Sequence, residues 1–440
     1  MTVSTQLREA FIVTNLSNSM KTNKTHLLVI SLGLHLPALA GPEAQTVPST
    51  PFSNQGDWCT WLQDKPGTLH KNKENPHLQE FRLEGRLHFQ TAHLQGEDVN
   101  NSDYSSDFNE FRRFRLGASA KFFQYFGAKV SFDLVYDERI DAEPNAGLDW
   151  GYEQIDEAYL SFDLGKAIGE SPFDTLSVSY GRVKYKFGQE ARTSSNELLT
   201  VERSAISNKV YGSYRPTGVN LDGTINQWSF TGALYSSTTD GADNEAFNGW
   251  QDDVIFYASA GYKVSDQLNL RADYVYNNAD VTEGDDSLLA YAWATSFNAE
   301  YDAGPWGIIG DFIYGDNGGA RTGNAPSNRD EFWGLVVMPY YWILPDKLQL
   351  VGQYQYGGAD DSAGFRINNR YGRARGTGGT SGIDVNSGRG DEHNSFYGGL
   401  NYYICGQSLK IQAGVEYQTM DTPIGDFNTL TYLLAFRTFF

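Results

Sequence analysis

The segment Leu78–Leu94 reads LQEFRLEGRLHFQTAHL, and its residues alternate between two kinds. One set is apolar or small and consists of Phe81, Leu83, Gly85, Leu87 and Phe89. The residues between them are polar or charged and are Arg82, Glu84, Arg86, His88 and Gln90. Successive side chains of a β-strand point to opposite faces, so a period of two places each set on its own face. The segment therefore predicts a strand with one apolar and one polar face.

The same alternation recurs along the chain, in residues 111–122, 128–136, 268–277 and 409–417. The chain also ends on an alternating segment, Leu430–Phe440. The apolar side chains that share one face of this segment are Tyr432, Leu434, Phe436 and the terminal Phe440. A final aromatic residue on an alternating strand is the usual end of an outer-membrane barrel.

The connections between these segments alternate in length. Long polar connections fall at 95–110, 137–154, 185–213, 237–252, 278–287, 316–330, 358–392 and 420–428, and short links lie around Gln124, 165–174, Thr224, Ser265, Ala303, Leu344 and Gly406. Short turns on one side and long loops on the other are typical of an outer-membrane barrel, which closes so that no strand edge meets lipid. We therefore predict a closed antiparallel transmembrane β-barrel of about 16 strands over residues 78–440. A soluble β-sandwich or solenoid is the competing interpretation, and the lack of an internal repeat speaks against it.

The N-terminal region predicts export. Lys21 and Lys24 precede the apolar run Leu27–Leu36, and Ala38-Leu39-Ala40 supplies the small residues of a cleavage site. We predict a signal peptide over residues 1–40, with Met20 as the better start, and a periplasmic lead-in over residues 41–77. After residue 41 no apolar run is long enough for a membrane helix.

The two cysteines of the chain, Cys59 and Cys405, could form one disulfide. The lead-in and the link at Cys405 both fall on the periplasmic side of the predicted barrel, which is an oxidising compartment. The pairing requires the lead-in to fold back under the barrel.

The connection from Gly181 to Arg215 is locally basic, although the net charge of the whole chain is -20. Its seven basic residues are Arg182, Lys184, Lys186, Arg192, Arg203, Lys209 and Arg215, against only three acidic ones. Long loops of compact proteins are usually either functional or disordered. Apolar residues such as Phe187 and Val201 favour an ordered loop that packs against another surface. Inside a closed barrel this loop would be the constriction of a pore.

Basic residues also cluster on the polar faces of the first three predicted strands, at Arg82, Arg86, Arg113, Arg115, Lys121 and Lys129. A column of such cations opposite carboxylates on the other wall would create a transverse field and a relay of anion sites. The alternative is that these cations and carboxylates only neutralise one another in a water-filled lumen. A further arginine-rich segment, Gly364–Arg375, is expected at the mouth, with Arg366, Arg370 and Arg373 exposed.

The sequence offers no sign of an enzyme. The histidines show no metal-ligand spacing, and neither a phosphate-cradling glycine loop nor a nucleophile elbow occurs. We therefore expect no catalytic residue, bound metal or cofactor, and the acidic net charge argues against nucleic acid as a partner.

Three blocks of sequence, in order, resemble the phosphate-selective porin O/P family. They are FRRFRLGASAKFFQYFGAKVSFDL (Phe111–Leu134), IDEAYLSF (Ile155–Phe162) and LSVSYGRVKYKFGQEARTSSNELLTVERSAI (Leu176–Ile206). The resemblance implies a 16-stranded homotrimeric porin of the outer membrane of a Gram-negative-type bacterium, with a loop folded into a lumen lined by basic residues. It carries over onto Arg113, Arg115, Lys121, Lys129, Lys184, Lys186 and Arg203.

Three functions compete. The first is a passive pore for small anions such as phosphate, filtered by the 181–215 loop. The second is a general or sugar-type porin for neutral solutes, in which Tyr180, Tyr185, Phe187 and Tyr211 would form an aromatic slide. The third is a structural surface protein whose acidic loops bind cations or a partner. In each case outer-membrane lipid and lipopolysaccharide surround the protein.

Overall fold

The computed structural model describes residues 58–64, 66–135, 150–211, 215–237, 253–279, 288–318, 330–367, 370–372 and 383–440. The predicted signal peptide, residues 41–57 of the predicted lead-in and most of the loops predicted at 137–154, 237–252, 278–287 and 316–330 lie outside these residues, as does Arg373.

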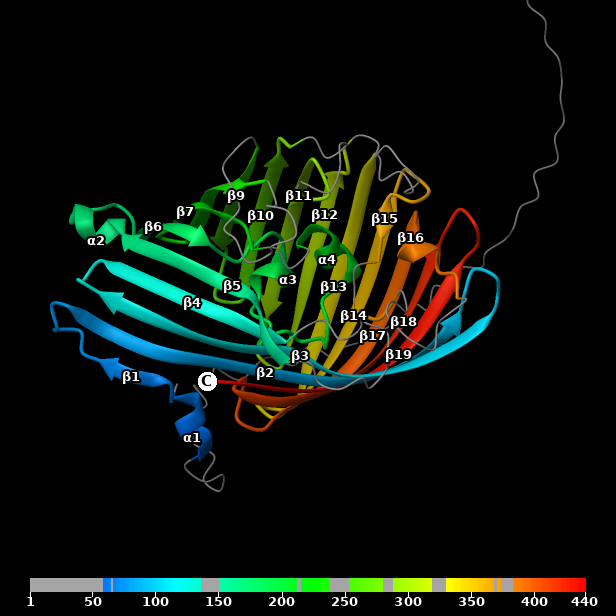
Figure 1. The fold of residues 1–440 in the computed structure, drawn as a ribbon, viewed down its shortest axis with the longest axis horizontal. Helices are drawn as coiled ribbons and strands as arrows, with labels where there is room; N and C mark the ends of the chain where they lie inside the picture. The colour runs from blue at the N-terminus through cyan, green and yellow to red at the C-terminus, as the bar shows by residue number, and fades with distance from the viewer. Residues whose placement is uncertain are drawn as a thin grey trace, which may run out of the picture. The chain divides into compact units, whose positions relative to one another are not determined.

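The described chain forms a sheet of 17 strands, of which 16 close into an antiparallel barrel. A separate two-stranded sheet pairs β15 (Phe365–Arg366) with β16 (Arg389–Gly390). The barrel strands are β2 (Leu78–Glu97), β3 (Asp103–Phe122), β4 (Phe126–Val135), β5 (Trp150–Asp163), β6 (Thr175–Arg182), β7 (Thr217–Ile225), β8 (Trp228–Ser236), β9 (Val254–Lys263), β10 (Leu268–Asn277), β11 (Trp293–Asp302), β12 (Trp306–Asp316), β13 (Glu331–Leu344), β14 (Leu348–Ala359), β17 (Glu392–Tyr403), β18 (Leu409–Asp421) and β19 (Phe427–Phe439). Each pairs with its neighbour in sequence order, and β19 pairs with β2 to close the ring (Figure 1). The predicted fold class is confirmed.

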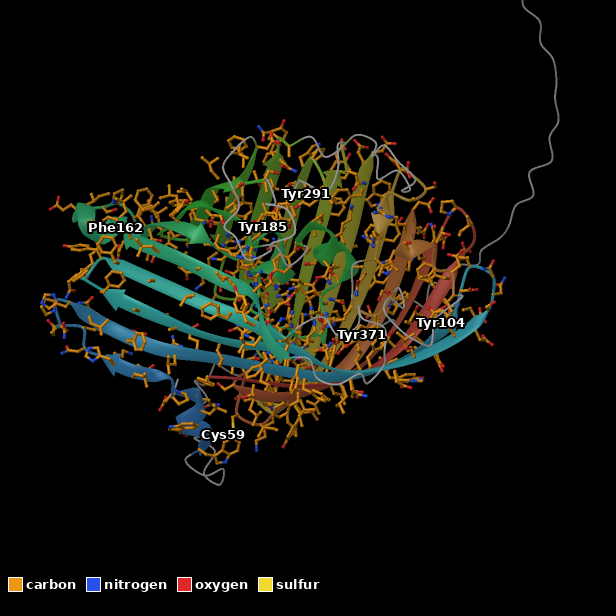
Figure 2. All side chains as sticks on the ribbon, viewed as in Figure 1. Cys59, Tyr104, Phe162, Tyr185, Tyr291 and Tyr371 are labelled. Carbon is orange, nitrogen blue, oxygen red and sulfur yellow. A yellow bond between two sulfur atoms is a disulfide. The ribbon has the colours of Figure 1, made fainter. Side chains whose placement is uncertain are left out.

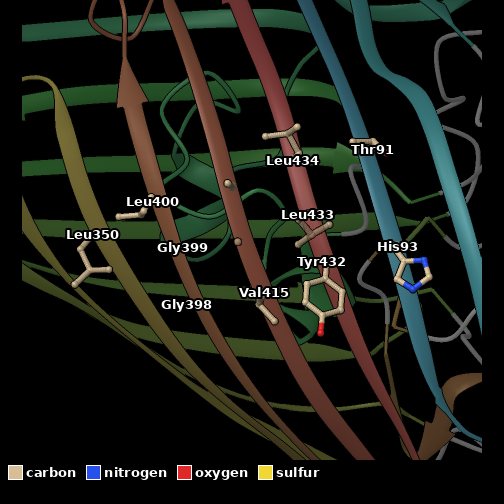
Figure 3. A pocket seen from close by; sticks show the side chains of 12 residues that line it. Thr91, His93, Leu350, Gly398, Gly399, Leu400, Val415, Tyr432, Leu433 and Leu434 are labelled. Atoms are coloured by element: carbon tan, nitrogen blue, oxygen red, sulfur yellow. The ribbon is translucent and has the colours of Figure 1, made fainter.

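The strands present their apolar face outward, as the alternation predicted. On β18, Ile411, Val415 and Tyr417 are exposed on the outer wall, whereas Lys410 and Gln412 on either side of Ile411 are buried inside. The same outer wall carries a shallow apolar groove of about 580 Å³ where Gly398 and Ala413 lie among larger side chains (Figure 3). Among the helices of the described residues, none is long and apolar enough to cross a membrane.

Aromatic side chains gather at the short turns. Exposed examples on this rim are Phe123, Tyr125, Trp228, Trp306, Tyr341, Tyr402 and Phe440. Tyrosine and tryptophan are enriched where a membrane protein meets the lipid headgroups, because their rings are apolar and their N–H or O–H groups are polar. This rim therefore marks a boundary of the membrane, and its short turns assign it to the periplasmic side.

The first hairpin is longer than expected. The predicted polar loop 95–110 is wrong in most of its length, because β2 runs to Glu97 and β3 begins at Asp103. In β2 after Thr91 and in β3 before Phe111, the side chains that point outward are polar, such as His93 and Asp107. This part of the hairpin therefore lacks an apolar face. The alternation of polarity is therefore hidden here, although Tyr104 and Phe108 still point inward and are buried.

The lead-in is fastened to the periplasmic rim. Within it, α1 (Trp58–Gln63) is followed by the short strand β1 (Thr68–Lys71), which pairs with β2 beyond the point where β19 ends. Cys59 of α1 is bonded to Cys405 in the turn after β17, with a Cα–Cα distance of 5.1 Å. The lead-in thus folds back under the barrel, as the pairing of these two cysteines requires.

We predict that deleting Phe440 impairs assembly. The Phe440 amide donates to the Gly85 carbonyl over 3.0 Å and its own carbonyl accepts from the Gly85 amide, so the last residue completes the seam between β19 and β2. The ring lies over Gly85, where a Cβ would come within 2.1 Å of it. The measurement is the fraction of the heat-modifiable folded form on gels run before and after boiling. A deletion that folds as fully as the wild type contradicts this prediction.

Candidate functional site

The connection between β6 and β7 lies inside the barrel. It contains α3 (Gln189–Arg192) and α4 (Ala205–Tyr211), which lie between the front and back walls in Figure 1. Most of its described side chains are buried, and they contact inward-facing residues of strands from β2 to β19. The prediction that this loop is ordered and packed against the barrel interior is confirmed by these contacts, and we call residues 183–216 the inner loop.

Aromatic packing holds one side of the inner loop. Tyr185 and Phe187 are stacked and belong to one buried cluster with Tyr211 and with wall residues such as Tyr291. The hydroxyls of Tyr185 and Tyr291 are 3.2 Å apart, and Tyr291 donates to the Val210 carbonyl over 2.8 Å (Figure 2). These rings are at most 2% exposed. They cannot form the aromatic slide of the sugar-porin hypothesis, because packing against the wall uses their faces.

Tyr180 does not belong to the interior either. Its side chain is 53% exposed on β6 and faces out of the barrel, together with the apolar residues of neighbouring strands. The hypothesis of an aromatic slide is therefore wrong for all four residues that suggested it.

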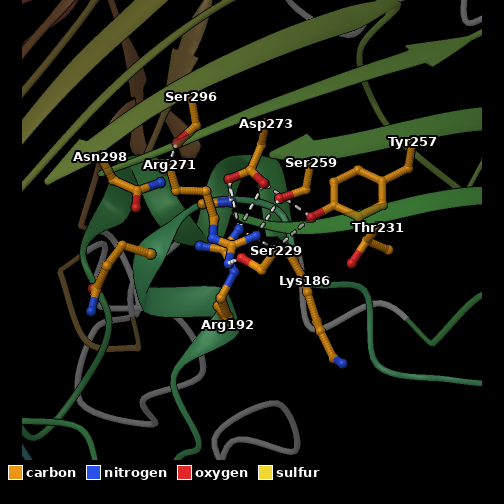
Figure 4. Close-up of polar contacts among 12 residues, drawn as sticks. Lys186, Arg192, Ser229, Thr231, Tyr257, Ser259, Arg271, Asp273, Ser296 and Asn298 are labelled. Carbon is orange, nitrogen blue, oxygen red and sulfur yellow. Dashed lines mark hydrogen bonds and ion pairs between the residues drawn. The ribbon is translucent and has the colours of Figure 1, made fainter. Parts of the chain in front are cut away.

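Carboxylates of the opposite wall anchor the start of α3 (Figure 4). Asp273 of β10 accepts the Gly188 amide over 3.2 Å and the Arg192 guanidinium over 2.7 Å. Asp311 of β12 accepts the Gln189 amide over 2.8 Å. The predicted transverse field assumed that such carboxylates face the lumen. Asp273 and Asp311 instead hold the inner loop.

The other side of the inner loop is anchored through its backbone carbonyls. Lys410 and Gln412 of β18 both donate to the Leu198 carbonyl over 3.0 Å. Arg437 of β19 donates to the Val201 carbonyl and, over 2.9 Å, to His88. A buried carbonyl needs a partner, and here the wall supplies charged donors for it. The inner loop is thus tied to walls on opposite sides of the barrel.

Several of the predicted pore-lining cations are neutralised. Arg115 pairs with Asp133 at 2.8 Å and with Asp156 at 2.9 Å, and Arg192 pairs with Asp273. Lys129 pairs with Glu157 at 3.0 Å and with Glu84 at 3.5 Å, and Arg82 lies 4.0 Å from Glu84. These residues agree with the alternative that the charges of the wall neutralise one another, since each cation has an acidic partner within reach.

Two predicted residues lie apart from this network. Lys121 is 71% exposed next to the short turn after β3, with its ammonium 4.0 Å from Glu80. Lys186 is also exposed, and its ammonium points away from the Asp273 cluster in Figure 4. Lys121 was expected to face the inner loop, and its position at the periplasmic end rules that out.

A second group of cations forms no ion pair with any carboxylate in the described part of the chain. Five of these cations, from β2, β3, the inner loop and β19, are Arg86, Arg113, Lys184, Arg203 and Arg437. Arg86 donates to Ser195 over 2.8 Å, Lys184 to the Thr193 carbonyl over 3.0 Å, and Arg203 to the Glu190 carbonyl over 2.8 Å. Burial and the neighbouring charges of Arg203, Arg215 and Arg86 lower the pKa of Lys184 to about 6. We call these five residues the unpaired basic group.

Arg113 is the extreme member of this group. Its side chain is 4% exposed, and its Nη1 atom is buried without a hydrogen-bond partner among the described residues. Leaving a buried charged donor unsatisfied is costly. A guanidinium whose Nη1 atom has no partner among the described residues is suited to an anion from outside the chain.

A β-bulge in β3 brings in a residue that the sequence interpretation missed. The pairing between β2 and β3 shifts at His88/Phe89, so Arg112 and Arg113 occupy one step of the ladder. Arg112 consequently reaches Glu202 of the inner loop at 2.8 Å. Burial would raise the pKa of Glu202, but the charges of Arg112 and Arg113 outweigh burial and lower it. The signal was present in the sequence, since two adjacent arginines interrupt the alternation.

The arginine-rich segment after β14 does not stand free at the mouth. Arg370 is 8% exposed and pairs with Glu110 of β3, and the Tyr371 hydroxyl donates to the same carboxylate. The expectation of an exposed Arg370 is wrong because Glu110 points inward from the long first hairpin and attracts it. Phe365 of the same segment is fully buried.

We predict that Asp273→Asn loosens the inner loop. The substitution removes the charge that holds Arg192 and weakens the acceptor of the Gly188 amide, and breaking a buried ion pair by removing one partner costs about 3–5 kcal/mol. The expected result is a larger and noisier single-channel conductance in planar bilayers. Asp222→Asn on β7 is the matched control, because Asp222 accepts a hydrogen bond from Thr231 of the neighbouring strand. Equal conductance in both variants would mean that Asp273 does not restrain the loop.

Among the described residues no group of three or more His, Cys, Asp or Glu side chains could hold a metal ion. The site therefore consists of a wall and a loop that bring cations together, some neutralised and some not.

Comparison with known proteins agrees with this architecture. Among solved structures, the outer membrane channel DcaP of Acinetobacter baumannii matches with a TM-score of 0.50 and 14% identity, over 81% of this chain and 97% of that chain. OmpF of Salmonella typhi matches with a TM-score of 0.50 and 12% identity, over 84% of this chain and 99% of that chain. At such identities the likeness concerns the fold alone. No curated protein matches.

The family model of the phosphate-selective porins O and P matches residues 81–305, just over half of the 440 residues. This span includes the first hairpin, the inner loop and Asp273. The chain therefore belongs to the phosphate-selective porin O and P family and is a β-barrel porin of the outer membrane.

Proposed function

We propose that this porin is a passive diffusion channel for small anions such as phosphate, and that the inner loop forms its basic constriction. Solutes move down their concentration gradient, so the protein contributes binding and repulsion rather than chemistry. The observation that carries the proposal is the unpaired basic group, in which five cations from β2, β3, the inner loop and β19 lack a described carboxylate partner.

The unpaired basic group is unusual in a chain with a net charge of -20. Like charges in a poorly screened space raise each other's free energy, and a mobile anion relieves that repulsion. The same positive charges repel cations and so disfavour their passage. Arginine also binds phosphate and carboxylate oxygens in a planar fork, which favours oxyanions over halides.

The neutralised cations support the same function indirectly. Arg115, Lys129 and Arg192 hold the wall and the inner loop in place through their ion pairs. Arg182 ends β6 where the inner loop begins, and Lys186 lies near the start of that loop, so both contribute to the local potential. We assign them to the approach to the constriction rather than to an anion site.

A general porin without selectivity remains the second candidate. Sugar-type recognition loses its support because Tyr185, Phe187 and Tyr211 are packed away from solvent. A structural surface protein is the third candidate, and it requires a barrel closed to ions. We further propose a homotrimer surrounded by outer-membrane lipid and lipopolysaccharide, as the family resemblance implies.

The test is a planar-bilayer recording of the purified porin under a salt gradient. An anion channel gives a reversal potential of the sign set by chloride, and added phosphate or polyphosphate should reduce the chloride current by competing for the unpaired basic group. A reversal potential near zero would favour a general porin. A barrel that carries no current would favour the structural role, and crosslinking before electrophoresis tests the trimer.

A further inference from the structure

The short helix α1 carries two tryptophans that the channel does not use. Trp58 is 49% exposed and Trp61 is 63% exposed, whereas Cys59 between them is buried. Positions three apart lie on one face of a helix, so the two indoles share the side that faces away from the Cys405 turn. No charged residue occurs within the helix, whose sequence is WCTWLQ.

This helix is fixed to the barrel at both ends. The Cys59–Cys405 disulfide holds its first turn. After the helix, the Gly67 carbonyl accepts the Leu83 amide over 2.8 Å, and a Cβ at Gly67 would lie 2.0 Å from the Leu83 carbonyl oxygen. The same Cβ would be 3.3 Å from the Phe440 ring. The helix is therefore held at both ends, and the chain just after it passes close to the C-terminal aromatic residue.

The rim that holds α1 is the aromatic rim of the lipid-facing wall. Cys405 follows Tyr402 by three residues, and Tyr402 is 44% exposed on the outside of β17. Phe440 is 40% exposed at the end of the last strand. The helix thus lies at the end of the barrel that carries the aromatic rim, near the C-terminus (Figure 1).

We propose that Trp58 and Trp61 extend this aromatic rim and seat α1 in the phospholipid headgroup region of the periplasmic leaflet. Indole suits this depth because its ring is apolar while its N–H group donates a hydrogen bond. An uncharged helix with an aromatic face avoids the cost of burying charge there. The disulfide positions the helix at the right depth, and lipid is the partner that covers its exposed face.

Fluorescence quenching in reconstituted vesicles tests the proposal. The full mature porin is compared with the double variant W58F/W61F, and the difference between the two emission spectra reports the two indoles alone. Vesicles of phosphatidylethanolamine and phosphatidylglycerol are prepared with and without lipids brominated near the headgroup. Heat-modifiability on gels verifies that both proteins are folded.

The expected result is that brominated lipid removes most of the difference signal, while aqueous iodide removes little. The matched control is W228F/W306F, because Trp228 and Trp306 are 52% and 46% exposed at other short turns of the same rim. Its difference signal should respond to brominated lipid in the same way. Quenching by iodide but not by brominated lipid would place the helix in the aqueous periplasm and overturn the proposal. Quenching by neither would mean that protein covers the helix, which overturns it equally.

Discussion

Replacing Arg86, Arg113 and Lys184 together by Glu should reverse the ion selectivity of this porin from anions to cations. At an effective dielectric constant of about 20, two unit charges about 8 Å apart interact by about 2 kcal/mol. Each arginine replacement changes the local charge by two units, and the Lys184 replacement changes it by one unit above the pKa of Lys184, which is about 6. Every 1.4 kcal/mol or so corresponds to about a tenfold change in an equilibrium constant. The anion-to-cation permeability ratio should therefore fall by more than a factor of ten, as measured from the reversal potential in a potassium chloride gradient.

These three residues are a better choice than Arg115, because Arg115 is bound to Asp133 and Asp156 and its loss would disturb the wall. The control replaces Lys121 and Lys263 by Glu. Both are exposed, at 71% and 53%, and lie by short turns away from the inner loop. This control should keep the wild-type reversal potential.

A milder variant separates loss of selectivity from loss of folding. R113Q/K184Q removes the charge of Arg113 and the titratable amine of Lys184 without introducing acids beside the inner loop, and it should give an intermediate permeability ratio. The heat-modifiable band shows whether each variant is folded. If folded charge-reversed protein keeps the wild-type reversal potential, the unpaired basic group is structural and the anion-channel proposal fails.

Anion selectivity should rise as the pH falls from 8 to 5. Burial and the charges of Arg203, Arg215 and Arg86 lower the pKa of Lys184 to about 6. Lys184 is therefore mostly neutral at pH 8 and mostly charged at pH 5, which adds one cation to the constriction. The permeability ratio for chloride over potassium should increase with a midpoint near that pKa. Chloride is the right probe because its own charge does not change in this range.

Two substitutions of Lys184 isolate its contribution. In K184R the side chain stays charged, so selectivity should be high at both pH values. In K184M the side chain stays neutral, so selectivity should be low at both. Burial and the charges of Arg389 and Arg366 lower the pKa of Lys209 to about 7, so Lys209 also titrates in this pH range. In K209R this side chain stays charged, and the variant therefore shows how much of the pH dependence comes from Lys209. A pH dependence that persists unchanged in K184R and K184M would assign it to another group.

The sequence alone determined the architecture and the membrane face of the protein. A period of two leaves only strands as an interpretation of segments such as 409–417, and strands with a lipid-facing side must close into a barrel. The even alternation of short and long connections then fixed which end faces the periplasm. The part of the first hairpin beyond Thr91 could not be predicted in this way. Its outward residues are polar as well, so the two faces of the strands do not differ in polarity.

Only the tertiary structure decided which charges are available to a solute. The sequence placed Arg113, Arg115 and Lys129 on one polar face, and nothing in their spacing distinguishes them. Arg115 and Lys129 are neutralised because Asp156 and Glu157 arrive from β5. Arg113 lies two residues before Arg115, next to the bulge at Arg112, and forms no ion pair with these carboxylates. Likewise Asp273 and Arg192 are 81 residues apart in the chain, yet they meet because the inner loop crosses the lumen. Ion pairs form between groups that closure brings within a few ångströms, and sequence distance carries no information about that separation.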